Sequence, residues 1–184
     1  MRLLLLPVLV SAIVASAHPA PADQTDSRLK GLFSRLQTTK STSEAQLVEG
    51  SIWQIWLETK DAQLERRVAA GVVAINRGDL KTALTIFDDV VKRAPDYAEG
   101  WNKRATVHYM MDAFDRSLVD VARTLALEPR HFGALSGLGL IYHELGDEAK
   151  ALKAMEKALE LHPLMPGLRE RIDSLREEVE GKAI

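Results

Sequence analysis

The chain of 184 residues contains no cysteine. This absence excludes disulfide bonds, thiolate zinc sites, a cysteine nucleophile and the lipidated cysteine of a bacterial lipoprotein. The folded chain must therefore be stabilised by its apolar core. Hydrophobic residues make up 46% of the sequence, a normal share for a globular protein.

An excess of charge of either sign is also absent. The 24 basic and 26 acidic residues give a net charge of −2, which offers no electrostatic reason to expect nucleic acid or an anionic membrane as partner. The sequence also lacks a glycine-rich phosphate loop, a serine nucleophile elbow and a carboxylate constellation. We therefore expect no enzymatic activity and no cofactor.

Long hydrophobic runs are limited to the N-terminus. Arg2 is followed by about a dozen mostly apolar residues and then by Ala15, Ser16 and Ala17, a pattern typical of a secretory signal peptide. The run is shorter than the roughly 20 residues that a membrane-spanning helix needs. We predict a signal peptide over residues 1–17 and a mature protein without stable membrane insertion, located in the periplasm or, as the alternative, secreted. An uncleaved interfacial anchor is the other interpretation.

Two further segments precede the central part of the chain. Residues 18–26 are rich in proline and polar side chains, which indicates a flexible leader. Residues 27–60 carry apolar side chains at helical spacing, interrupted by a polar run. Ser41 and Glu44 fit a capping box, so a second helix should begin near Thr42. This segment is predicted to form a helical hairpin. It is either unrelated to the repeats that follow it or a degenerate fourth repeat.

The central part of the chain repeats at one interval. Pro95, Pro129 and Pro163 lie 34 residues apart. Four further sets share this spacing: Gly71, Ala105 and Gly139; Ala83, Ser117 and Ala151; Phe87, Val121 and Met155; Val91, Leu125 and Leu159. A period between 20 and 50 residues is typical of a stacked array of structural repeats.

Each repeat should contain two helices. Gly78, Asp112 and Gly146 mark the turns between them, where a left-handed residue is required. The small residues at two of the repeating positions would allow the paired helices to approach closely. We predict an all-α solenoid with repeats at 64–97, 98–131 and 132–165, followed by a capping helix at 166–180 that has one apolar stripe.

The last repeat resembles the tetratricopeptide-repeat (TPR) motif. It carries Leu138, Gly139, Tyr142, Ala151, Ala158 and Pro163 in the order and spacing of that motif. The middle repeat departs from the motif, with Arg104 in the leucine position and His108 in the tyrosine position. The resemblance implies a right-handed superhelix in which the first helices line a groove for an extended peptide or a partner's helix. It also implies a protein without catalytic activity.

Mapping the motif onto the chain gives a set of candidate groove residues. They are Val68, Val72, Ile75, Asn102, Thr106, Tyr109, Ser136, Leu140 and His143. Such a surface can bury an apolar side chain at its valine end and hydrogen-bond a peptide backbone at its polar end. It differs from the carboxylate-clamp TPRs, which need Lys and Asn where this chain has Val68 and Val72. The alternative is that these residues face solvent or are covered by the N-terminal hairpin.

Several other side chains allow two interpretations each. Trp53 and Trp56 would form either core or an exposed hot spot, and we favour core. Arg104 should pair with Asp120, since an unpaired buried charge is costly, although an anion hook in the groove is the alternative.

The charged and titratable side chains outside these pairs give no site of their own. The five histidines show no metal-ligand spacing, so no metal site is expected. Glu148, Lys150 and Lys153 are assigned to a solvated helix face.

The sequence thus predicts a non-enzymatic interaction module that binds a peptide or protein segment in its groove, acting as an adaptor in the bacterial envelope. Two alternatives come from other classes. One is a structural repeat protein that self-associates and has no separate ligand. The other is an enzyme or metal protein that uses His108, His143 and Tyr109.

Overall fold

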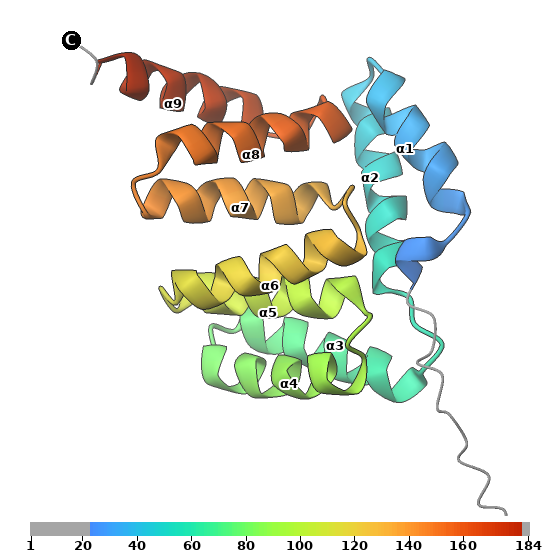
Figure 1. Ribbon diagram of the computed structural model, residues 1–184. Coiled ribbons are helices and arrows are strands. Elements are labelled where there is room, and N and C mark those ends of the chain that lie inside the picture. Colours follow the sequence, from blue (N-terminus) through green and yellow to red (C-terminus); the bar gives the residue numbers. More distant parts are fainter. Residues whose placement is uncertain (1–22, 182–184) are drawn as a thin grey trace, which may run out of the picture.

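The computed structural model describes residues 23–181, and within them it contains nine α-helices and no strand. The predicted signal peptide and residues 18–22 of the leader lie outside this part of the chain. Figure 1 shows the helices as a stack of hairpins with one hairpin across its side. The helices are α1 (Arg28–Thr38), α2 (Thr42–Leu57), α3 (Ala62–Asn76), α4 (Leu80–Arg93), α5 (Ala98–Met110), α6 (Phe114–Leu127), α7 (Phe132–Glu144), α8 (Glu148–Leu161) and α9 (Leu168–Gly181).

The stack consists of three hairpins formed by α3–α4, α5–α6 and α7–α8, with α9 packed against α8. Successive hairpins meet through α4 with α5 and through α6 with α7. The predicted all-α solenoid is therefore confirmed. The turn residues also behave as predicted, because Gly78, Asp112 and Gly146 have φ angles of 73°, 56° and 74°.

The paired helices of a hairpin touch at the small residues. A Cβ atom added to Gly71 would lie 2.6 Å from the Phe87 ring. A Cβ atom on Gly139 would overlap the Met155 side chain and lie 3.1 Å from the backbone oxygen of Ala151. In the middle hairpin the buried Ser117 hydroxyl donates to the Ala105 carbonyl oxygen over 2.8 Å. Close approach at these positions is thus an observed property of the fold.

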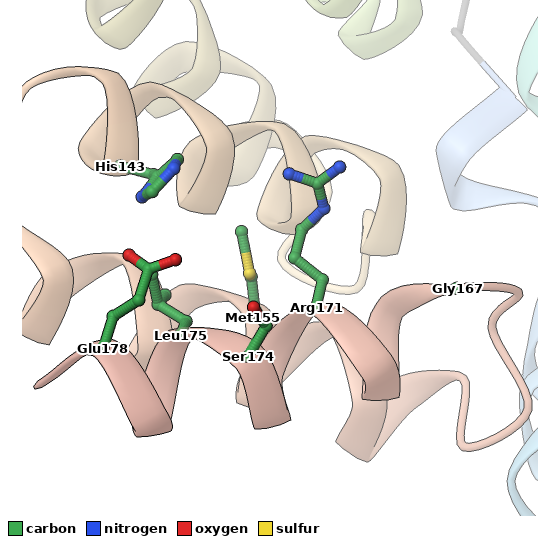
Figure 2. A pocket seen from close by; sticks show the side chains of 7 residues that line it. All are labelled: His143, Met155, Gly167, Arg171, Ser174, Leu175 and Glu178. Atoms are coloured by element: carbon green, nitrogen blue, oxygen red, sulfur yellow. The ribbon is translucent and has the colours of Figure 1, made fainter. Parts of the chain in front are cut away.

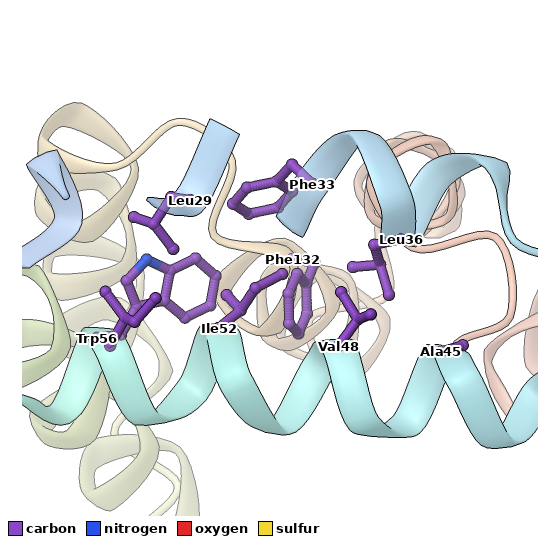
Figure 3. Close-up of a cluster of buried hydrophobic side chains, with 9 residues drawn as sticks. Leu29, Phe33, Leu36, Ala45, Val48, Ile52, Trp56 and Phe132 are labelled. Carbon is purple, nitrogen blue, oxygen red and sulfur yellow. The ribbon is translucent and has the colours of Figure 1, made fainter. Parts of the chain in front are cut away.

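The N-terminal hairpin α1–α2 packs across the stack instead of continuing it. Helix α2 contacts α5, α1 contacts α8, and Figure 1 shows α2 running crosswise to the stacked helices. Its apolar face forms one core cluster with Phe132 at the start of α7, which Figure 3 shows between the side chains of α1 and α2. Trp56 is 2% exposed, so its assignment to the core is correct, whereas Trp53 is half-buried.

Polar contacts cap α2 and hold the segment just before α1. The Ser41 hydroxyl accepts from the Glu44 backbone N–H, which confirms the predicted cap of α2. Just before α1, Asp23–Thr25 form a 3-10 turn, and the Gln24 side-chain amide donates to the Asp96 carbonyl oxygen over 2.6 Å. The last residues assigned to a flexible leader are therefore held against the stack by a hydrogen bond that their polar composition does not indicate.

Arg104 forms the predicted pair with Asp120. Its guanidinium donates to both carboxylate oxygens of Asp120 over 2.7 Å, and to Asp88 over 2.9 Å. Asp120 is 1% exposed, so this two-point contact neutralises a charge inside the middle hairpin.

Among residues 23–181, no helix combines the length and the hydrophobicity needed to cross a bilayer.

The close approach at Gly139 gives a test with an internal control. Gly139→Ala should lower the free energy of unfolding by about 1–3 kcal/mol, because the new methyl group meets Met155 and the Ala151 backbone. Gly137→Ala in the same helix adds a methyl group that has no atom within 4 Å. It should raise the free energy of unfolding by up to about 1 kcal/mol through helix propensity. Denaturant unfolding of both variants measures the two signs, and equal effects would contradict the packing.

Candidate binding face

The first helices of the three hairpins, α3, α5 and α7, lie next to one another, since α5 contacts both of the others. We call their common surface the first-helix face. The candidate groove residues all lie on these helices, but their burial differs. Val68 and Asn102 are buried and Thr106 is exposed, while the intermediate class contains Val72, Ile75, Tyr109, Ser136, Leu140 and His143.

An apolar pocket lies between α2 and α3. Its volume is about 610 Å³, and Val68 and Val72 of α3 line it together with Trp53 and Leu57 of α2. The carboxylates Glu58 and Glu65 also line this pocket. Sequence reasoning placed the two valines at an apolar end of the face. Cover by the N-terminal hairpin was the alternative, but Trp53 and Leu57 of α2 were not identified as the side chains that border the valines, because nothing in the repeat pattern says where the hairpin packs.

A smaller cavity of about 110 Å³ lies between α5 and α7 and is lined by Asn102, Thr106, Tyr109 and Leu140, among others. The Thr106 hydroxyl donates to the backbone oxygen of Asn102 over 3.0 Å. One amide N–H of Asn102 donates to buried Glu99 over 3.0 Å. A ligand in this cavity would therefore meet the amide oxygen of Asn102 and the Thr106 hydroxyl oxygen.

Tyr109 links the edges of α5 and α7. Its hydroxyl donates to Glu144 Oε1 over 3.3 Å. Burial and the neighbouring Glu144 carboxylate raise the pKa of Tyr109. The phenol is therefore neutral at physiological pH and acts as a hydrogen-bond donor at this position.

A third hollow, of about 370 Å³, lies between α7 and α9 (Figure 2). His143 lines it from α7, whereas Arg171 and Glu178 line it from α9. His143 Nδ1 lies 2.9 Å from Glu148 Oε2. Glu148 is 14% exposed at its side chain, so its assignment to a solvated helix face is wrong, whereas Lys150 and Lys153 are exposed as assigned. The residues of α9 were not among the sequence candidates.

Two of the candidate groove residues lie outside these three hollows, namely Ile75 and Ser136. Ile75 packs against the core of the first hairpin.

A buried acid–histidine pair lies where α2 meets the stack. His131 Nε2 is 2.9 Å from Glu99 Oε2, and both side chains are 0% exposed. The Ala134 backbone N–H donates to His131 Nδ1, so the ring proton is on Nε2 and is donated to Glu99. Trp56 stacks on the imidazole with a centroid distance of 4.2 Å. No solvent reaches this pair, so it holds the hairpins together and is not an acid–base site.

Glu99 is charged despite this burial. Burial alone would raise the pKa of its carboxyl group, but Lys103, whose ammonium lies 2.8 Å away, and the hydrogen bond from His131 outweigh it. The pKa of Glu99 is consequently lower than its ordinary value. The charged carboxylate therefore contributes stability to the folded state at neutral pH.

The residues of the enzyme alternative have separate partners. His108 is buried, its Nε2 lies 3.8 Å from Asp120, and burial lowers the pKa of its imidazole. Tyr109 contacts Glu144 and His143 contacts Glu148. Because each side chain faces a different carboxylate, the three do not converge on one substrate or ion.

Comparisons with known proteins agree with this architecture. The sequence model described as "Tetratricopeptide repeat" matches residues 132–164. A TPR repeat-containing protein of Rhizobium etli is 33% identical over 154 residues, which cover 84% of this chain and 76% of that protein. The Hsp70-Hsp90 organizing protein of Triticum aestivum is 31% identical over 101 residues, but these are 55% of this chain and only 17% of that protein.

Solved structures share the fold at low sequence identity. The first TPR of Spaghetti (RPAP3), bound to the HSP90 peptide SRMEEVD, aligns with a TM-score of 0.62 and 19% identity over 65% of this chain and 96% of that chain. The Yersinia enterocolitica type III secretion chaperone SycD, in complex with a peptide of the translocator YopD, aligns with a TM-score of 0.61 and 15% identity. The alignment covers 68% of this chain and 98% of that chain. At these identities the likeness concerns the fold.

The charge of Glu99 makes stability depend on pH. Since the pKa of Glu99 is lower in the folded state, its contribution is present above the ordinary value of 4.5 and is lost as the pH falls through the folded-state pKa. Glu99→Gln should be less stable than the parent at neutral pH by about 1.5–3 kcal/mol, because Lys103 and His131 lose their contacts with a charged carboxylate. Its free energy of unfolding should then fall less steeply below about pH 5.

Denaturant unfolding across this pH range measures both effects. Glu177→Gln, which changes an exposed carboxylate of α9, serves as the control and should keep the parent's stability at neutral pH. Parallel pH profiles for the parent and Glu99→Gln would show that the buried carboxylate contributes nothing to acid stability.

Proposed function

Because this chain belongs to the tetratricopeptide-repeat family, we propose that it is a non-enzymatic interaction module that binds a peptide or protein segment on its first-helix face. The observation that carries this proposal is the apolar pocket between α2 and α3, next to the more polar cavity between α5 and α7. Peptide complexes of the RPAP3 and SycD repeats support this mode of binding.

The pocket between α2 and α3 is suited to an apolar anchor residue. Its volume of about 610 Å³ lies within the range of small-ligand sites. Burying one large apolar side chain against Val68, Val72 and Trp53 would contribute about 1.5–3 kcal/mol. An amphipathic partner segment would then extend along the face toward Thr106, where hydroxyl and amide oxygens accept from its backbone.

The charges around the pocket favour a basic residue next to the anchor. Glu58 and Glu65 line the pocket, and Glu58 is already paired with Arg28 over 2.7 Å. Val68 and Val72 occupy the positions where a carboxylate clamp needs Lys and Asn. An acidic C-terminal peptide such as SRMEEVD therefore lacks the clamp residues and meets Glu65, whereas Lys or Arg beside an apolar side chain would be attracted to Glu65.

Self-association has less support. The two most exposed large apolar side chains of the described residues are Leu47, at 75%, and Val119, at 66%. They lie on α2 and α6, which belong to different hairpins. Single exposed apolar residues of this kind are normal on a monomer.

Selection from a displayed peptide library, with the full chain as bait, tests the peptide proposal. We expect peptides with an apolar residue next to Lys or Arg, binding with micromolar affinity, about −8 kcal/mol. Val72→Glu places a charge in the pocket and should weaken binding at least tenfold. Val73→Glu is the matched control, since Val73 is 46% exposed and does not line the pocket.

Circular dichroism of both variants verifies that they fold, and the peptide SRMEEVD should not bind. The proposal fails if no peptide is selected, or if Val72→Glu and Val73→Glu bind the selected peptide equally.

We further propose that the protein acts in the bacterial envelope, as an adaptor in the periplasm. The apolar run after Arg2 and the small residues ending at Ala17 support export. Cell fractionation followed by intact-mass measurement should find the protein in the periplasmic fraction with His18 as its first residue. A cytoplasmic protein that retains Met1 would contradict this location.

A further inference from the structure

Three potential metal ligands converge at the end of the stack, although the sequence showed no ligand spacing. His143 lies near the end of α7, Glu148 begins α8, and Glu178 lies on α9. One ligand atom from each side chain lies within 4.8 Å of the other two. Figure 2 shows Glu178 extending from α9 toward the imidazole of His143. The cluster is therefore assembled by the tertiary fold from three separate helices.

The donor set selects a class of ion. One imidazole nitrogen and two carboxylates suit zinc and neighbouring divalent transition metals, whereas calcium and magnesium prefer oxygen ligands only. Ligands of a tetrahedral zinc ion are about 2.0–2.2 Å from the metal, and therefore about 3.4 Å from one another. Since Glu178 is exposed, rotation of its side chain can close the remaining distance.

The surroundings leave room for an ion with a bound water molecule. His143 and Glu178 line the hollow of about 370 Å³ between α7 and α9. Glu148 and His143 are partly buried, at 14% and 36% side-chain exposure, which limits competition from water. Arg171 lines the same hollow from an earlier turn of α9, and its charge opposes a cation. The affinity for a cation therefore depends on attraction by the two carboxylates and repulsion by the Arg171 guanidinium.

We propose that His143, Glu148 and Glu178 bind one divalent transition-metal ion of the zinc class, which ties α9 to the last hairpin. The contact of 2.9 Å between His143 Nδ1 and Glu148 Oε2 is a hydrogen bond in the absence of metal. A metal ion bound to Nδ1 would take the place of this proton, which moves to Nε2 of the neutral ring. Because the ion joins α9 to both helices of the last hairpin and binds only the folded chain, it stabilises the folded state.

Calorimetric titration of the full chain with Zn²⁺ alone tests this site. The protein is made without a polyhistidine tag, stripped with a chelator and dialysed. One Zn²⁺ per chain should bind with micromolar or tighter affinity, and the thermal midpoint should rise with the ion. Glu178→Gln should weaken binding at least tenfold and remove the thermal shift. As Glu178 is exposed, this variant keeps the fold.

Two further variants sharpen the result. Glu177→Gln changes the exposed carboxylate next to Glu178 and should bind Zn²⁺ like the parent. Arg171→Ala removes the opposing charge and should bind more tightly. Absence of a stoichiometric site, equal binding by Glu178→Gln and the parent, or equal affinity for Ca²⁺ and Zn²⁺ would each overturn the proposal.

Discussion

The architecture depends on how closely two helix axes can approach within each hairpin. At Gly71 and Gly139 the neighbouring helix leaves no space for a single additional carbon atom. Each such contact lets an apolar residue of the second helix, Phe87 or Met155, lie directly on the backbone of the first. The hairpins are consequently thin, and successive ones stack on flat apolar faces. The distance between the first and second helices of these hairpins follows from this contact.

The N-terminal hairpin packs across the regular array and adds a pocket that the repeats alone do not form. Trp53 and Trp56 of α2 contact His131 and Phe132, which lie where the middle hairpin passes into the last one. This junction places α2 next to α3 and creates the apolar pocket. The hairpin therefore acts both as a part of the core and as one wall of the candidate binding site.

The features that the sequence predicted are those that its period encodes. Helix pairs, turns at Gly78 and Gly146, and close approach at Gly139 each follow from one repeating position. The Arg104–Asp120 pair was also predictable, because a charge at a position that normally packs inward needs a partner within its own hairpin. These inferences needed only contacts between residues fewer than 34 apart.

The missed features depend on contacts that no repeat position specifies. The place of α2 is set by packing of Trp56 on His131, 75 positions later, and His131 carried no distinguishing pattern. The approach of Glu178 to His143 depends on the rotation of α9 about its axis, which its apolar stripe fixes only coarsely. Glu99 resembles an ordinary charged residue of a first turn, and only the structure shows it inside the protein.

The crosswise hairpin has a consequence for how the array responds to force and heat. In a simple solenoid each repeat contacts only its neighbours, so terminal repeats can fray while the remainder stays intact. Here α2 contacts α5 and borders α3 at the apolar pocket, and α1 contacts α8, so the N-terminal hairpin packs on the first, middle and last hairpins of the stack. The N-terminal hairpin therefore couples the repeats, so we expect the array to unfold as one cooperative unit and not repeat by repeat.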